Sequence, residues 1–193
     1  MLTGTSRTRT ILATAAAVAA LGALLQWMSP GPESAIPPGS TLPAAYRSAP
    51  TTNSPASDAM ADEVAQRFRQ GVIMLHAREH EHAAAAFHRV LALTPRLPEA
   101  HVNMGFAMLG QFRHGFARDF FESAIALRPS QRNAYYGLAA AFEGLGDLRG
   151  AVGAMRTYVH LSPPDGPYLR KANAALWEWN AALASGQASR PRS

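Results

Sequence analysis

Three 13-residue segments of this chain carry nearly the same pattern of side chains. They read AAAAFHRVLALTP from Ala83 to Pro95, ARDFFESAIALRP from Ala117 to Pro129, and AVGAMRTYVHLSP from Ala151 to Pro163. Each begins with alanine, has a large side chain four residues later and ends in Leu-x-Pro, and successive copies start 34 residues apart. A fixed period of this size indicates a repeat architecture in which each copy is one supersecondary unit.

The spacing within each copy predicts two packed helices. A small side chain at the first position lets two helix backbones approach, and the large side chain one turn later fills the remaining gap. One such pair cannot bury its apolar face alone, but three stacked pairs can. The small positions are Ala83, Ala117 and Ala151, and the large ones are Phe87, Phe121 and Met155.

This pattern resembles the tetratricopeptide repeat (TPR) family, which also has a small residue in the first helix of each unit, here Gly71, Gly105 and Ala139. The resemblance implies an all-α fold, a right-handed α-solenoid of three helix-turn-helix repeats at residues 64–97, 98–131 and 132–165. Apolar residues recur at helical spacing after the third repeat, which predicts a capping helix over residues 166–184. Residues 185–193 are expected to be a disordered tail.

In the family, the first helices of successive repeats line a concave groove that binds peptides. The 34-residue register places mostly apolar and aromatic side chains there, which favours an apolar or amphipathic guest anchored on Phe106 and Tyr136. The charged clamp with which one subclass grips a terminal carboxylate is missing, and only Asn103 keeps a matching residue type. The predicted groove residues are Phe68, Val72, Leu75, Val102, Asn103, Phe106, Leu109, Tyr136, Ala140 and Glu143.

The N-terminal part predicts attachment to a membrane. Residues 1–10 are basic, and residues 11–28 form an uncharged, apolar run of 18 residues. A helix of that length, at about 1.5 Å per residue, is just long enough to span a bilayer. A cleaved secretory signal is the alternative, although no convincing cleavage site follows. Residues 29–58 are rich in Pro, Ser and Ala, a composition typical of a linker that cannot form a core.

Arg7 and Arg9 precede the apolar run, and the next basic residue is Arg47, so the positive-inside rule predicts that the C-terminal domain is exported. The expected location is the periplasmic side of a bacterial inner membrane, with the domain anchored there. If the N-terminal segment is cleaved, the protein is instead secreted or periplasmic.

Composition argues against several other functions. The formal charge of +5 is spread along the chain without a basic stripe, so we expect no nucleic-acid partner. The absence of cysteine rules out thiolate chemistry, and no serine, histidine and acid form a nucleophile arrangement, so we expect no catalytic residues and no cofactor. The cluster His76, His80 and His82 could be read as a metal site, but the repeat register favours solvated histidines at a turn, so no metal is predicted.

Together these features predict a membrane-tethered adaptor or scaffold that binds an exported protein or peptide, with a role in the assembly of an envelope complex. The alternatives are a homo-oligomeric structural component, or an accessory factor of cytochrome c maturation or pilus assembly. The roles in cytochrome c maturation and in pilus assembly rest on analogy of architecture alone.

Overall fold

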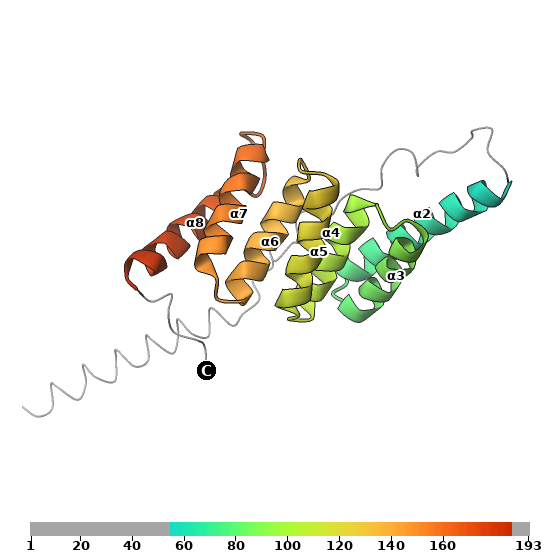
Figure 1. The fold of residues 1–193 in the computed structure, drawn as a ribbon, viewed down its shortest axis with the longest axis horizontal. Coiled ribbons are helices and arrows are strands. Elements are labelled where there is room, and N and C mark those ends of the chain that lie inside the picture. Colours follow the sequence, from blue (N-terminus) through green and yellow to red (C-terminus); the bar gives the residue numbers. More distant parts are fainter. Residues whose placement is uncertain (1–54, 187–193) are drawn as a thin grey trace, which may run out of the picture. The chain divides into compact units, whose positions relative to one another are not determined.

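The computed structural model describes residues 55–186, and seven α-helices make up most of this range (Figure 1). The predicted basic N-terminus, membrane segment and residues 29–54 of the linker lie outside the described residues, as do residues 187–193 of the tail. None of the helices between residues 55 and 186 combines the length and apolarity needed to cross a membrane. The helices are α2 (Pro55–His76), α3 (His80–Leu93), α4 (Pro98–Gly110), α5 (His114–Leu127), α6 (Arg132–Gly144), α7 (Leu148–Leu161) and α8 (Leu169–Ala184).

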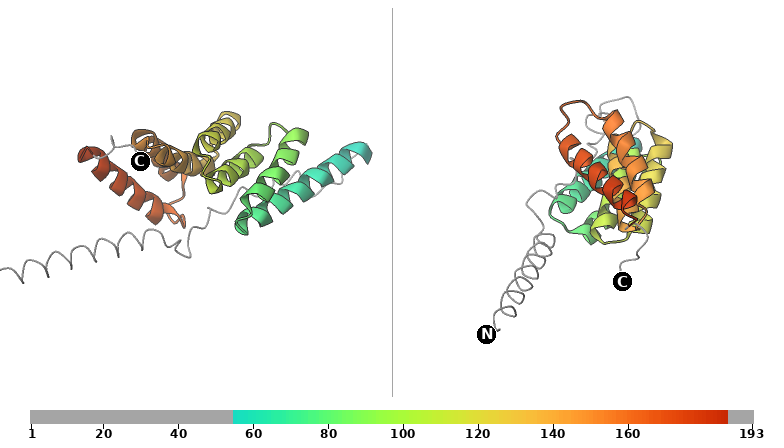
Figure 2. Two further views of the ribbon diagram at one scale, coloured as in Figure 1. Left: turned by 90° about the horizontal axis from the view of Figure 1, so that it is seen from below. Right: turned by 90° about the vertical axis from the view of Figure 1, so that its left-hand side faces the viewer.

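The helices form three antiparallel pairs that follow one another in sequence order (Figures 1 and 2). Helices α2 and α3, α4 and α5, and α6 and α7 pack together within the pairs, while α3 contacts α4 and α5 contacts α6 between them. The first helices also meet directly, because α4 contacts both α2 and α6. Helix α8 packs on α7. The all-α prediction is therefore confirmed for the described residues.

Two predicted boundaries need correction. Helix α2 begins at Pro55, so residues 55–58, which the sequence assigns to the linker, are helical. Proline is well tolerated in a first helical turn, because its missing N–H has no intrahelical partner there. At the other end, α8 begins at Leu169 and not at residue 166, since Pro167 and Tyr168 form the turn that precedes it.

Glycines in the first helices make room for two large rings from the second helices, Phe87 and Phe121, which we call the aromatic wedges. A Cβ on Gly71 would lie 2.8 Å from Phe87, and one on Gly105 would lie 2.7 Å from Phe121. Both rings are fully buried, as are Ala83, Ala117 and Ala151. The close helix approach predicted from the small residues is therefore confirmed. Phe121 also reaches the next repeat, where a Cβ on Gly137 would lie 2.2 Å from its ring.

The turn within each pair repeats the same backbone conformation. Arg78, Phe112 and Gly146, each 34 residues from the next, have φ angles of 62°, 58° and 80°. The amide that follows each of them donates a 2.9 Å hydrogen bond to the carbonyl five residues earlier, as from Arg113 to Met108. A left-handed residue with this bond is the usual way for a helix to end. Glycine adopts it without strain, but only the third turn uses glycine.

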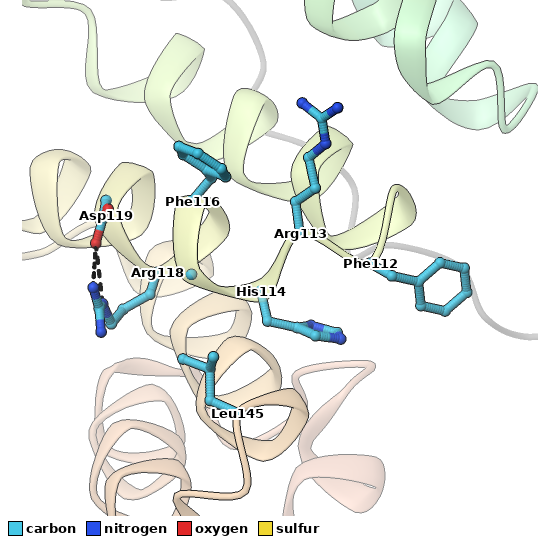
Figure 3. A pocket seen from close by; sticks show the side chains of 8 residues that line it. Phe112, Arg113, His114, Phe116, Arg118, Asp119 and Leu145 are labelled. Carbon is cyan, nitrogen blue, oxygen red and sulfur yellow. Dashed lines mark hydrogen bonds and ion pairs between the residues drawn. The ribbon is translucent and has the colours of Figure 1, made fainter. Parts of the chain in front are cut away.

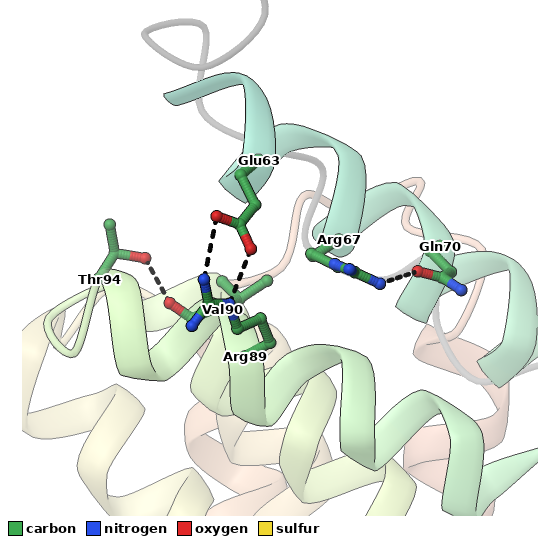
Figure 4. Close-up of polar contacts among 6 residues, drawn as sticks. All are labelled: Glu63, Arg67, Gln70, Arg89, Val90 and Thr94. Carbon is green, nitrogen blue, oxygen red and sulfur yellow. Dashed lines mark hydrogen bonds and ion pairs between the residues drawn. The ribbon is translucent and has the colours of Figure 1, made fainter. Parts of the chain in front are cut away.

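Polar contacts add to the packing at the surface. In the first repeat the guanidinium of Arg89 on α3 donates to both carboxylate oxygens of Glu63 on α2, at 2.7 and 3.1 Å (Figure 4). In the second, Arg128 at the end of α5 forms an ion pair with Glu99 at the start of α4. Glu99 and Asn103 are the only polar or charged side chains that are buried in the described part of the chain.

Candidate peptide-binding surface

The ten predicted groove residues lie on the three first helices, α2, α4 and α6, which we call the inner wall. The contacts of α4 with both neighbours make this wall continuous. The structure does not bring all ten to its surface. Val72, Leu109, Tyr136 and Ala140 are half-buried and Glu143 is exposed, whereas the remaining five, Phe68, Leu75, Val102, Asn103 and Phe106, are buried.

Phe68 and Phe106 are both buried, and this changes the role predicted for Phe106. Its ring is only 4% exposed and packs edge-on against Phe121, with ring centroids 5.1 Å apart. Phe68 meets Phe87 in the same way at 5.6 Å. Each ring therefore extends the aromatic wedge of its own repeat, and Phe106 belongs to the core. It does not serve as the exposed anchor that the sequence predicts.

Asn103, at the centre of α4, is the polar exception in this wall. Its side chain is 0% exposed, and neither Nδ2 nor Oδ1 has a hydrogen-bond partner among residues 55–186. One turn earlier on the same helix, the Oε2 atom of Glu99 is also buried and unpartnered there. Leaving such groups unsatisfied costs about 1–3 kcal/mol each, so most buried polar atoms find partners. Packing within the described helices does not explain this carboxamide.

Tyr136, the other predicted anchor, stands at the end of the inner wall next to α8. Its ring lies 5.2 Å from that of Tyr158 and 6.3 Å from that of Tyr168, both edge-on. Burial, with the neighbouring tyrosines and Glu143 as smaller causes, raises the pKa of the Tyr136 hydroxyl to about 12. Its hydroxyl therefore stays protonated, and able to donate a hydrogen bond, across the physiological range.

Helix α8 contributes to this end of the wall in a way that the sequence does not reveal. The indole Nε1 of Trp179 donates a 3.1 Å hydrogen bond to Oε1 of Glu143. Trp179 is buried, and Tyr168 precedes α8 directly. Apolar periodicity predicts the helix, but it does not identify the acceptor of the Trp179 indole.

The three clustered histidines are directed to different surroundings. Nδ1 of His76 lies 2.8 Å from the Val72 carbonyl of its own helix, and the His82 ring lies 3.6 Å from Glu79. The His80 ring packs against Gly110 of the next repeat, where an added Cβ would lie 2.3 Å from it. Within residues 55–186 no three His, Asp or Glu side chains are grouped so that they could hold a metal ion.

A second surface, not predicted from the sequence, lies at the turns between paired helices. A hollow of about 500 Å³ is lined by side chains from the α4–α5 turn, the start of α5 and the α6–α7 turn (Figure 3). We call Phe112, Arg113, Phe116 and Leu145, which line it, the edge patch. The one sequence signal for it is Phe112, a large apolar residue at the position where the third turn has Gly146.

Comparison with known proteins supports the fold. No family model matches the sequence, and no curated protein matches it significantly. Solved structures do match. The first TPR of Spaghetti (RPAP3), bound to the HSP90 peptide SRMEEVD, is 20% identical with a TM-score of 0.59, and the match covers 63% of this chain and 94% of that one.

Two further neighbours match a similar share of the chain. The TPR2B domain of yeast Sti1, in complex with pHsp70, is 14% identical with a TM-score of 0.58, over 62% of this chain and 97% of that one. The type III secretion translocator chaperone SycD of Yersinia enterocolitica is 12% identical with a TM-score of 0.59, over 63% and 95%. These likenesses, together with the paired helices and their 34-residue period, show that the described helices have the fold of a TPR domain.

Proposed function

We propose that the helical repeats act as an adaptor whose inner wall binds an apolar or amphipathic segment of a partner protein. The wall is continuous across α2, α4 and α6. Two of the structural neighbours were solved with a partner, the HSP90 peptide SRMEEVD for Spaghetti and pHsp70 for the TPR2B domain of Sti1. The half-buried Val72, Leu109 and Ala140 supply apolar contact along the wall.

The observation that carries this proposal is the unpartnered carboxamide of Asn103. A carboxamide has both a donor and an acceptor, the pair of groups that a peptide main chain also offers. Because Asn103 is 0% exposed, the inner wall has to open locally before a guest segment can reach it. The guest would then satisfy both groups, and would recover the free energy that the isolated fold loses by burying them. The adjacent Oε2 of Glu99 could accept a further N–H from the same guest.

The charges at the predicted groove positions favour an internal segment over a carboxyl terminus. Glu143 is an exposed carboxylate at the α8 end of the wall, and Glu99 is a second carboxylate near its centre. Arg128 pairs with Glu99, but the predicted groove positions include no basic residue. A terminal carboxylate would therefore meet like charges without a cation of its own. An internal segment carries no such charge and depends on apolar contacts and main-chain hydrogen bonds.

Replacing Asn103 with leucine tests the proposal, because the change separates a binding role from a structural one. Leucine is of similar size and removes two unsatisfied polar atoms. We therefore expect Asn103→Leu to melt at the same or a higher temperature than the parent chain, and to bind its partner more weakly by about 1–3 kcal/mol. If the variant instead melts at a lower temperature and captures its partner unchanged, Asn103 has an internal role and the proposal fails.

Partner capture can be measured by photo-crosslinking in cells that express the full chain. A photoreactive residue at Leu109 on the inner wall should give a discrete crosslinked species that becomes weaker in the Asn103→Leu background. The same residue at the exposed Arg156 on α7 is the matched control and should give none. Equal crosslinking from both positions would show that the inner wall is not the binding surface.

We further propose that residues 11–28 anchor the domain in a membrane, with the repeats on the exported side. This part rests on the sequence alone, through the length of the apolar run and the two arginines before it. Alkaline extraction of membranes should leave the full chain in the pellet, and protease added to intact spheroplasts should digest the repeats. Release of a shortened, soluble chain would instead indicate cleavage of the segment.

A further inference from the structure

The edge patch concentrates exposed apolar surface in one place. Phe112 is 82% exposed, Phe116 62% and Leu145 47%. They are three of the seven large apolar side chains that are exposed between residues 56 and 186, and all three line the same hollow (Figure 3). Single exposed apolar residues are ordinary on protein surfaces, but a group of them around a hollow is typical of an interaction site.

Phe112 is unfavourable for the isolated fold in two ways. Its φ of 58° is a left-handed conformation that glycine adopts freely and that bulky side chains rarely adopt. Its ring also gains nothing from burial, although it stands edge-on to His114 at a centroid distance of 6.4 Å. The matching positions show that the turn does not require an aromatic residue, because they hold Arg78 and Gly146.

The base of the edge patch is held in place by the joint between the second and third repeats. The His114 ring packs against Gly144 at the end of α6, where an added Cβ would lie 2.3 Å away. The main-chain hydrogen bonds from Arg113 to Met108 and from Asp147 to Phe142, both 2.9 Å, fix the two turns that carry Phe112 and Leu145. The patch is therefore preorganised, which lowers the conformational cost of binding.

The charges around the patch indicate the chemistry of a partner. Arg118 pairs with Asp119 at 2.8 Å, so this pair contributes no free charge. Arg113 is exposed and takes part in none of the ion pairs found among residues 55–186, which leaves one cation beside the apolar side chains. One free cation suits a single carboxylate better than an anionic membrane surface, which attracts clusters of basic residues.

From these observations we propose that the edge patch is a second docking surface, separate from the inner wall, for an amphipathic helical segment of a partner protein. The segment would place a large apolar side chain in the hollow beside Phe112, Phe116 and Leu145. A carboxylate within one helical turn of that side chain would pair with Arg113. The edge patch shares no residue with the predicted groove positions.

Three synthetic 14-residue helical peptides probe this surface. All three carry the same leucine and phenylalanine side chains on one face of the helix. They differ at a single position, one turn after the phenylalanine, where the residue is Glu, Gln or Lys. Binding to the purified full chain is followed by fluorescence anisotropy of a label on the peptide. We expect the Glu peptide to bind at least tenfold more tightly than the Lys peptide, and Arg113→Glu to reverse that order.

Two further variants separate binding from folding. Phe112→Gly removes the ring and the backbone strain together, so it should keep or raise the melting temperature while weakening the Glu peptide at least tenfold. Ile73→Ser, at a side chain that is 68% exposed on α2, is the matched control and should leave binding unchanged. Asn103→Leu should also leave it unchanged, so failure of the inner-wall proposal would not affect this one.

Several results would overturn the proposal. One is absence of binding by the Glu peptide, and another is equal binding of the Glu and Lys peptides. Unchanged binding by Phe112→Gly would show that the peptide binds elsewhere. Flotation with phosphatidylglycerol vesicles that depends on Phe112, without selective peptide binding, would assign the patch to a lipid surface.

Discussion

Gly137 on α6 offers the sharpest test of how neighbouring repeats are joined. Phe121 belongs to the second repeat, yet its ring lies so close to α6 that a Cβ on Gly137 would come within 2.2 Å of it. On its other side the ring meets Gly105 of α4, where a Cβ would come within 2.7 Å. The fully buried ring thus fills a slot between two glycines of successive first helices. Gly137→Ala introduces one methyl group into that slot.

The expected effect is the difference between two opposing terms. Alanine is a better helix former than glycine by about 1 kcal/mol. Overpacking a filled core usually costs about 1–3 kcal/mol. The upper end of this range applies because the Phe121 ring also packs against α4 at Gly105 and therefore cannot move away from Gly137. The net loss is therefore about 2 kcal/mol. For a domain of this size, about 1 kcal/mol shifts the melting temperature by roughly 3–5 °C, so we expect a fall of roughly 6–10 °C.

Urea and thermal unfolding of the full chain, followed by circular dichroism at the helix band, measure this loss. Gly153→Ala on α7 is the matched control, because a Cβ built there meets nothing within 4 Å beyond its chain neighbours and the backbone of its own helix. It should keep the helix-propensity gain alone and stabilise the chain by up to about 1 kcal/mol. If Gly137→Ala is as stable as Gly153→Ala, the ring does not fill the slot and the repeat joint is held in some other way.

A double-mutant cycle identifies the side chain responsible. Phe121→Leu removes the part of the ring nearest Gly137, so the alanine at position 137 should cost much less in that background. The coupling free energy between the two positions should therefore be about 1–2 kcal/mol, the range expected for residues in direct contact. Additive effects would place the strain elsewhere.

Polar groups provide three more tests. Asp147 Oδ1 accepts a 2.9 Å hydrogen bond from the Gly150 amide at the start of α7, so Asp147→Ala should cost about 1 kcal/mol in urea unfolding. The hydrogen bond from Arg89 lowers the pKa of Glu63, so the stability it contributes is present above the usual value of 4.5 and lost as pH falls through the lower folded pKa. Parent and Glu63→Gln chains should then unfold at different urea concentrations at pH 7 and at the same one at strongly acidic pH. Tyr136, with a pKa raised to about 12, contributes stability below its ordinary value of 10.0 that is lost as pH rises through 12. Absorbance at 295 nm should show a late tyrosine step that Tyr136→Phe removes.

The repeat period determines most of what the sequence can predict about this fold. Ala83, Ala117 and Ala151 identify the close helix approaches because a small side chain that recurs every 34 residues marks the same contact in each repeat. The prediction fails where no second copy exists for comparison. Helix α2 begins nine residues before the first repeat, in a segment whose composition resembles the linker, so periodicity carries no information about its start.

The inner wall shows a different limit of sequence reasoning. The register places Phe106 and Leu109 correctly on the same helix as the other wall residues of the second repeat, but it cannot say which of them the fold itself covers. Phe106 is buried because the wedge from its own repeat, Phe121, stands beside it. Asn103 lies on the same wall. Its lack of hydrogen-bond partners among the described residues is visible only in the structure. Exposure depends on neighbours that are distant in sequence, which a single-helix pattern does not contain.

The separation between packing and recognition explains why both proposed surfaces can exist in so small a domain. The positions that hold the repeats together, such as Gly71 and Phe87, recur with the period and tolerate little change, because each fills the space that the other leaves. The turn positions 78, 112 and 146 share a backbone conformation that main-chain hydrogen bonds maintain, so their side chains can differ as widely as arginine, phenylalanine and glycine. A residue at such a position can change the surface without disturbing the core. Phe112 is such a residue, and its left-handed backbone and exposed ring destabilise the isolated fold. A partner that covers the ring would offset this loss of stability.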